Sequence, residues 1–187
     1  SKYIFVSKNF KFGKKRAGDV TTLKNFEKKY LYKTVITAPY KKEKKTISSS
    51  LIRNIIYQGR VEVAEKLLGR PWCVEGLVVK GEQRGRKIGF PTCNIKLNSY
   101  TIPKLGVYSV RVQINNLKKK GVANIGYRPT FCGKSLLLEV NIFGIKRNLY
   151  KRTLKINFIK FIRAEKKFKN IKQLITQIKK DIISVKK

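Results

Sequence analysis

The sequence predicts a mainly β fold, in which a six-stranded antiparallel barrel and a C-terminal helix follow a smaller, partial α/β segment. Three observations lead to this prediction. From Trp72 onward, six short apolar runs are separated by turns that contain Gly, Asn and Pro, which is typical of an antiparallel barrel. Before Trp72, strand-like and helix-like runs alternate, as they do in α/β sheets. The final segment carries apolar residues at helical spacing.

The first 40 residues read as strand, loop, helix and strand. "KYIFV" (2–6) is a short apolar strand, and "NFKFGKKRAGD" (9–19) is a basic loop that contains glycine. "VTTLKNFEKKY" (20–30) has helical spacing, and "YKTVITAPY" (32–40) is typical of a strand that ends at a proline. This order predicts an α/β sheet of the Rossmann-like kind.

An interrupted helix is expected over residues 46–69. The serines at its start are candidates for the N-cap. Gly59 breaks the apolar periodicity, and Gly69 with Pro71 ends the helix.

Six strands are expected to form the barrel. Their ranges are 72–81, 91–97, 106–114, 119–127, 135–143 and 154–163. The alternation is clearest in "GVYSVRVQI" (106–114), where Tyr108 and Val110 share one face and Ser109 and Arg111 share the other. The tail "NIKQLITQIKKDII" places one apolar stripe on a helix, formed by Ile171, Leu174, Ile175, Ile178 and Ile182. We expect this stripe to pack on the barrel.

The composition is strongly basic, with 45 Lys and Arg against 10 Asp and Glu and a formal net charge of +35. Such a charge suggests a nucleic-acid partner, and a basic RNA-binding β-barrel protein is therefore the alternative function. The lysines are spread along the whole chain and accompany abundant Ile, Asn, Phe and Tyr. This favours a compositional bias over a specific nucleic-acid surface, because net charge bears on partners and solubility rather than on fold.

The chemistry available to this chain is limited by what it lacks. It contains no histidine, which excludes Ser-His-Asp and Cys-His catalysis and most zinc chemistry. Its three cysteines, Cys73, Cys93 and Cys132, form no CxxC pair and support neither a zinc site nor a disulfide framework. A reducing cytoplasm fits the three cysteines best.

No apolar run reaches 18 residues, so we expect no membrane span. The absence of Met suggests a fragment whose true start is missing.

A basic loop rich in glycine is the first candidate for a binding site. "KGEQRGRKIG" (80–89) contains three glycines and four cations. Glycines let backbone N–H groups approach an anion, and the cations attract it. The loop matches neither the P-loop pattern nor the dinucleotide fingerprint. From the residues alone, an ordinary basic hairpin loop remains the alternative.

Thr92 and Asn94 in "PTCN" are the second candidate. Successive side chains of a strand point to opposite faces, so these two side chains share one face. A hydroxyl and an amide oxygen are hard ligands that can hold Mg²⁺ beside the phosphates of a nucleotide. The alternative is the polar outer face of a strand.

Glu139 is the third candidate. It is the one charged residue in the apolar run "SLLLEVNIF" (135–143), where a carboxylate is unfavourable unless it is paired or functional. Glu139 could accept a proton from a substrate hydroxyl. The alternative is a structural role, in which Glu139 lies on an edge strand and pairs with a lysine.

From about Leu67 to Ile183 the chain resembles the riboflavin kinase module, which in bacteria is the C-terminal half of the bifunctional riboflavin kinase/FAD synthetase. The resemblance is carried by "LLGRPW" (67–72), "GxxRGRKIGFPTCN" (81–94), "GVY" (106–108), "GVANIGYRPTF" (121–131), "LEVNIF" (138–143), "LY" (149–150) and "FIRAEKKF" (161–168). "NFKFGKKRAGD" (9–19) and "ISSSLIR" (47–53) are similar to later blocks of the FMN adenylyltransferase domain. The resemblance implies a remnant of that nucleotidyltransferase domain over 1–66 and a riboflavin kinase domain over 67–187.

The resemblance implies phosphate transfer from ATP to the ribityl 5′-hydroxyl of riboflavin, giving FMN. It assigns Mg²⁺ to Thr92 and Asn94 and the role of general base to Glu139. The expected ATP-binding residues are Gly81, Gly85, Arg86, Lys87, Gly89, Pro91 and Thr92. The expected flavin-binding residues are Leu105, Phe161 and Arg163. Riboflavin and ATP are the implied partners, with no membrane and no specific nucleic acid.

The chain departs from the family pattern at several positions. Family members usually carry His where this chain has Asn141, and an acidic residue where it has Gly144. The adenylyltransferase remnant retains Gly13, Arg16, Ser48, Ser49 and Arg53. The HxGH-type nucleotide motif of that domain is absent, so we do not expect this chain as given to make FAD, although the full-length protein would adenylylate FMN.

Overall fold

The computed structural model describes residues 1–42, 45–97, 100–130, 133–145 and 147–186. The chain divides into two compact units, Ser1–Ser48 and Ser49–Lys187, and each is described by itself. The expected domain boundary after residue 66 stays a prediction, since compactness alone groups the helices that follow Ser48 with the barrel.

The N-terminal unit is built around two parallel strands, β1 (Tyr3–Ser7) and β4 (Lys33–Thr37). The helices α1 (Val20–Asn25) and α2 (Glu27–Tyr30) connect them, as the strand–helix alternation predicts. The basic loop contains the short strands β2 (Lys11–Phe12) and β3 (Gly18–Asp19), with the 3₁₀ turn η1 (Lys14–Arg16) between them. The pair β5 (Lys41–Lys42) and β6 (Lys45–Thr46) follows β4.

Asp19 determines where α1 begins. Its carboxylate accepts a hydrogen bond from the backbone N–H of Thr22 at 3.0 Å, which completes a capping box. That bond, together with the side chain of Lys11, lowers the pKa of the Asp19 carboxyl. The helix therefore starts at the end of the basic loop.

Two helices open the second unit, α3 (Ser49–Tyr57) and α4 (Val61–Leu68). Gly59 and Gly69 have φ angles of 77° and 71°, which glycine adopts without a steric penalty. Both glycines lie where the sequence predicts an interruption and an end. Ile55, Ile56 and Val61 join the hydrophobic core.

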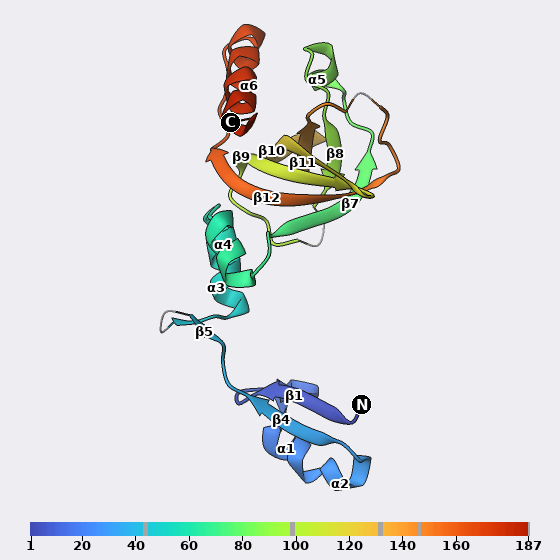
Figure 1. Ribbon diagram of the computed structural model, residues 1–187, viewed down its shortest axis with the longest axis vertical. Coiled ribbons are helices and arrows are strands. Elements are labelled where there is room, and N and C mark those ends of the chain that lie inside the picture. Colours follow the sequence, from blue (N-terminus) through green and yellow to red (C-terminus); the bar gives the residue numbers. More distant parts are fainter. Residues whose placement is uncertain (43–44, 98–99, 131–132, 146, 187) are drawn as a thin grey trace. The chain divides into compact units, whose positions relative to one another are not determined.

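Six strands close into the predicted antiparallel barrel in the order β10-β11-β8-β7-β12-β9. They are β7 (Cys73–Val79), β8 (Cys93–Lys96), β9 (Gly106–Ile114), β10 (Leu117–Thr130), β11 (Gly133–Ile142) and β12 (Thr153–Arg163). In Figure 1 the short helix α5 (Arg84–Lys87) and the C-terminal helix α6 (Ile171–Lys186) stand at one end of the barrel. The helices α3 and α4 lie at the other end.

The barrel interior is filled by one face of each strand, as expected for a small barrel. In β9 the predicted alternation is confirmed, because Tyr108, Val110 and Val112 are buried while Arg111 is exposed. Aromatic rings meet near one end, where the Phe158 ring lies 4.7 Å from Trp72 and 5.2 Å from Tyr108 between centroids.

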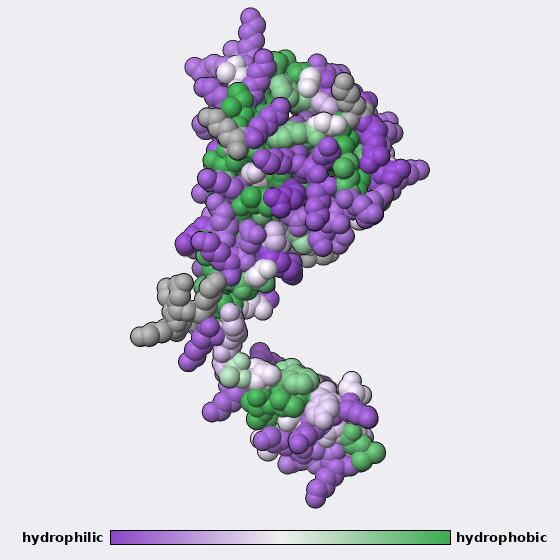
Figure 2. Space-filling model, viewed as in Figure 1, coloured by the Kyte–Doolittle hydropathy of each residue, from purple (hydrophilic) through white to green (hydrophobic). Residues whose placement is uncertain are grey.

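The two units differ at their surfaces. Figure 2 shows a mostly hydrophilic surface over the barrel and a cluster of hydrophobic residues at the surface of the N-terminal unit. Exposed apolar residues of that unit include Phe5 at 67% and Leu31 at 85%, because a two-stranded sheet has little area with which to cover its faces. Among the described residues, no helix is long and apolar enough to cross a membrane.

Candidate functional site

A row of polar side chains crosses three neighbouring strands of the barrel. Asn94 on β8 lies opposite Glu139 on β11, and Glu139 lies opposite Asn124 on β10. Directly opposed residues of an antiparallel pair point to the same face. The strand register therefore brings together an amide and a carboxylate that the sequence separates by 45 positions.

Two pockets share Thr92; the second contains Asn124 and Glu139 of this row, whereas Asn94 lines neither pocket. The first has a volume of about 330 Å³ and is lined by Gln83, Arg86 and Thr92 from the loop after β7 and by Arg147 and Tyr150 from the loop before β12. The second pocket has a volume of about 480 Å³. Its lining includes Thr92 and Glu139, together with apolar residues of α6.

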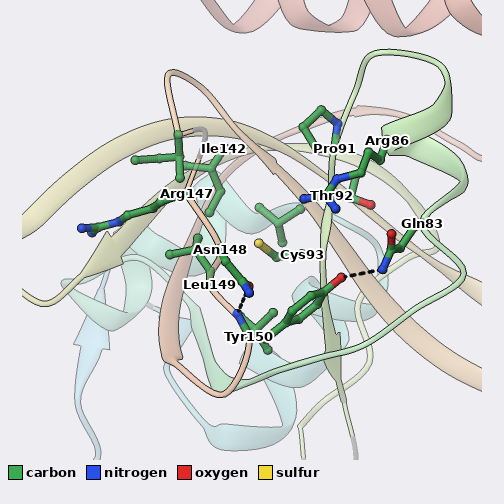
Figure 3. Close-up of a pocket in the computed structure, with 13 residues that line it drawn as sticks. Gln83, Arg86, Pro91, Thr92, Cys93, Ile142, Arg147, Asn148, Leu149 and Tyr150 are labelled. Carbon is green, nitrogen blue, oxygen red and sulfur yellow. Dashed lines mark hydrogen bonds between the residues drawn. The ribbon is translucent and has the colours of Figure 1, made fainter.

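The loop between β7 and β8 folds back over Thr92. The Phe90 N–H donates to the Gly85 carbonyl at 2.8 Å, and a Cβ on Gly85 would lie 3.5 Å from Thr92 Oγ1. Gln83, the N-cap residue before α5 with φ of 56°, donates through Nε2 to Tyr150 Oη at 3.2 Å. Figure 3 shows this hydrogen bond, which joins the two loops that line the first pocket.

The other expected nucleotide residues belong to the same loop. Arg86 and Pro91 line the first pocket, and Lys87 is the last residue of α5. Gly89 has φ of 85°, so its position in the loop requires a conformation that favours glycine.

Asn94 offers a ligand atom with no protein partner. It is 5% exposed, and its Oδ1 is one of two buried side-chain atoms in the described residues that lack a hydrogen bond. A buried, unsatisfied oxygen is unfavourable, and in proteins such an atom is usually satisfied by a water molecule, an ion or a ligand group. The Thr92 hydroxyl and the Asn94 amide oxygen are hard donors that fit Mg²⁺ with phosphate oxygens.

Gly81 packs directly on the Asn94 amide. A Cβ at this position would lie 2.8 Å from Asn94 Cγ and closer still to Nδ2. We expect Gly81→Ala to displace the amide and to lower the free energy of unfolding by about 1–3 kcal/mol, the usual effect of overpacking. Denaturant unfolding measures this change. Glu82→Ala is the matched control, since Glu82 is exposed, and equal stability of the two variants would contradict the packing.

Glu139 is half-buried and lines the second pocket. Its neighbour Asn141, at the position where the family usually has His, donates through Nδ2 to the Pro91 carbonyl at 2.7 Å. This bond ties β11 to the residue immediately before Thr92. Asn124, which lies opposite Glu139, donates to Glu165 Oε1 at 3.4 Å. The asparagine at position 141 thus supports the backbone at the junction of the pockets.

The three expected flavin residues lie at or beside the paired ends of β9 and β12, but they do not line one pocket. Arg163 lines the second pocket. Leu105 packs on the hydrophobic core, and the Phe161 ring packs on Tyr108 with 5.1 Å between centroids. Neither lines the two pockets described above. The apolar lining of the second pocket includes Leu174, Ile178 and Ile182 of α6, which the sequence predicts to pack on the barrel.

The residues expected of an adenylyltransferase remnant fall into both compact units. Gly13 and Arg16 lie in the basic loop of the first unit and have φ angles of 76° and 59°. Ser48 is the last residue of the same unit. Ser49 and Arg53 belong to α3 in the second unit.

The fold and its site together define a class of protein, the closed β-barrels with two pockets that meet at Thr92 and with a carboxylate, Glu139, in the second pocket. A family model described as riboflavin kinase matches residues 68–187, which is more than half of the chain. A model described as FAD synthetase matches residues 1–51. The chain belongs to the riboflavin kinase family.

Curated relatives carry one description, bifunctional riboflavin kinase/FMN adenylyltransferase. The Bacillus subtilis protein is 48% identical over 73% of this chain and 45% of its own length. The protein of Buchnera aphidicola subsp. Schizaphis graminum is 39% identical over 100% of this chain and 61% of its own length. This chain thus spans between about half and three fifths of these relatives.

A solved structure supports the fold over nearly the whole chain. It is described as a macrolide-efflux protein from Streptococcus pneumoniae, and it matches with a TM-score of 0.82 and 36% sequence identity. The match covers 99% of this chain and 60% of that chain.

Proposed function

We propose that this chain transfers the terminal phosphoryl group of ATP to the ribityl 5′-hydroxyl of riboflavin, which gives FMN and ADP. One observation carries the proposal: Thr92 lies where a pocket with cationic side chains adjoins a pocket that contains Glu139. A donor and an acceptor held on the two sides of Thr92 would meet beside a carboxylate. The family membership and the descriptions of the curated relatives support the same reaction.

The first pocket is proposed to bind the nucleotide. Arg86 and Arg147 supply positive charge at its lining, and the glycines of the 81–89 loop let backbone N–H groups approach the phosphates. Mg²⁺ bound by Thr92, Asn94 and phosphate oxygens would offset the negative charge that develops on the leaving ADP. The protein's own contribution is to fix these donors before the reaction.

The second pocket is proposed to bind the flavin. Its volume is within the range of roughly 300–1,000 Å³ that is usual for small-molecule sites. Leu174, Ile178 and Ile182 provide an apolar wall for a planar ring. Glu139, which lies on β11 and lines the same pocket, would orient the ribityl hydroxyl and accept its proton during in-line attack.

The remaining parts of the proposal concern the whole protein. We place the kinase domain at 67–187 and an adenylyltransferase remnant at 1–66, and we place the reaction in the cytoplasm. FAD formation is not proposed for this chain as given, because it contains no histidine and the motif expected for adenylyl transfer is absent. The efflux activity in the description of the Streptococcus protein is not proposed either, since the family models and curated relatives agree on flavin chemistry. Family membership gives no support to the RNA-binding alternative.

One assay tests the proposal. The protein is incubated with riboflavin, ATP and Mg²⁺, and FMN and FAD are quantified separately by chromatography. We expect FMN with an equal amount of ADP, no FAD, and no FMN when a chelator removes the divalent metal. Flavin binding without release of ADP would instead indicate an inactive flavin carrier and would overturn the proposed kinase activity.

Cys93 provides a test of the nucleotide pocket. Its thiol lines the first pocket, and burial raises the pKa of this thiol. Because the thiolate is the nucleophile, alkylation by iodoacetamide should be slow at neutral pH and should accelerate as the pH rises. We expect Mg²⁺ and ATP to slow alkylation of Cys93 several-fold, as measured by peptide mass spectrometry. Cys73 lines neither pocket and serves as the internal control, and equal labelling of Cys93 with and without ATP would contradict the placement.

A further inference from the structure

A buried ion pair fastens α6 to the barrel at the edge of the second pocket. Asp181, on α6, is 4% exposed. Arg163, at the end of β12, donates to it through Nε at 3.0 and 3.1 Å and through Nη2 at 2.7 Å. This two-point geometry fixes orientation as well as distance. Both residues line the second pocket.

The surroundings of the pair leave the carboxylate little capacity for a ligand. Gln177 Nε2 donates to Asp181 Oδ1 at 2.8 Å, so both carboxylate oxygens already accept hydrogen bonds within the protein. Arg163 also donates through Nη1 to the Ala164 carbonyl at 3.0 Å. Asp181 therefore acts on the pocket through Arg163 and through the helix that carries it.

The rest of α6 explains why this pair matters for the pocket. An amphipathic helix is normally held by its apolar face, but Leu174, Ile178 and Ile182 line the second pocket. Ile171 at the start of α6 is 63% exposed. Asp181 and Val185 are the buried residues of the helix. The helix is thus anchored near its C-terminal end while its middle forms the wall of a cavity.

We propose that Asp181 is a positioning residue of the acceptor pocket: by holding the Arg163 guanidinium, it fixes α6 as the wall against which a planar apolar acceptor binds. The inference rests on the proposed function, because it takes the acceptor to be a flavin. The pair lies away from the first pocket, whose lining includes neither residue. Loss of the pair should therefore weaken flavin binding and leave nucleotide binding intact.

The test compares riboflavin binding, by quenching of flavin fluorescence without ATP, with steady-state kinetics of the same variants. Asp181→Asn keeps the size of the side chain but leaves Arg163 without its counter-charge. We expect the Kd and KM for riboflavin to rise about tenfold or more. The KM for ATP and the kcat at saturating riboflavin should change less than about twofold.

Two further variants keep the test decisive. Ser184→Ala is the matched control, since the Ser184 hydroxyl donates to the backbone carbonyl of Asp181 at 2.7 Å, and it should bind riboflavin as the wild type does. Arg163→Lys keeps the charge but loses the two-point geometry. It should weaken riboflavin binding to an intermediate extent, and it replaces Asp181→Asn if circular dichroism shows that variant to be unfolded.

The outcomes separate the inference from the proposed function. Unchanged riboflavin affinity in folded Asp181→Asn, or in Arg163→Lys, overturns the positioning role while the kinase proposal stands. A parallel loss of ATP and riboflavin affinity also overturns it, because that result indicates only a structural role. Wild-type protein that binds no riboflavin overturns both.

Discussion

Thr92→Ala is expected to lower FMN formation by a few orders of magnitude. Thr92 lines both pockets, and its hydroxyl is one of two proposed protein ligands of Mg²⁺. A site that works by neutralising charge on the phosphates loses much of its effect with one metal ligand. The measurement is kcat with riboflavin and ATP over a range of Mg²⁺ concentrations, and half-maximal activity should shift to higher Mg²⁺.

Thr92→Ser is the control for this experiment, because it keeps the hydroxyl and removes only a methyl group. It should retain most of the activity. A loss below about threefold in Thr92→Ala would exclude the metal role, since ligand removal affects the rate far more strongly. Normal activity in both variants would leave Asn94, with its unsatisfied Oδ1, as the sole protein ligand to consider.

The barrel could be predicted from the sequence because its signals are local. Alternation in 106–114 and turns between the apolar runs define the strands, and the structure has β9 at the same bounds. The approach of Asn94 to Glu139 depends on the pairing of β8 with β11, which no local pattern encodes. Resemblance to a family supplied that link in advance.

Apolar residues of the core and of a pocket look alike in a sequence. Periodicity shows which face of α6 is apolar but not what covers it, so it does not reveal that Leu174, Ile178 and Ile182 line a pocket. The flavin role expected for Phe161 stays a prediction, and in the structure its ring packs on Tyr108. One side of the first pocket, with Arg86, Pro91 and Thr92, belongs to the loop predicted to bind ATP. The other side was not predicted, because the loop with Tyr150 meets Gln83 only in the tertiary structure.

Asp181 shows a different limit. In a tail rich in lysine, a single acidic residue is expected to be solvated, and the apolar stripe passes on both sides of it. Its burial depends on Arg163, which lies 18 positions earlier on another element. Only the tertiary structure reveals that this carboxylate has a partner.

Glu139→Gln is expected to leave ATP and riboflavin binding nearly unchanged while turnover falls. The substitution keeps the size and hydrogen bonding of the side chain but removes the proposed base. General-base contributions are about 10²–10⁴-fold, so kcat should fall by that factor with little change in KM. Steady-state kinetics with both substrates measure this, and Glu62→Gln on the exposed face of α4 is the matched control.

The competing explanation for Glu139 is an ion pair with one of the cations near it, since Arg84 and Lys166 line the same pocket. An exposed pair contributes only about 0–1 kcal/mol to stability. That explanation therefore predicts near-normal turnover in Glu139→Gln and a slightly shifted melting temperature. Retention of most of the kcat would show that the base assignment is wrong, and the proposed kinase mechanism would then depend on Thr92 and Asn94 alone. A large loss of kcat at an unchanged melting temperature would instead assign the carboxylate to the reaction, because stability and turnover would have separated at one residue.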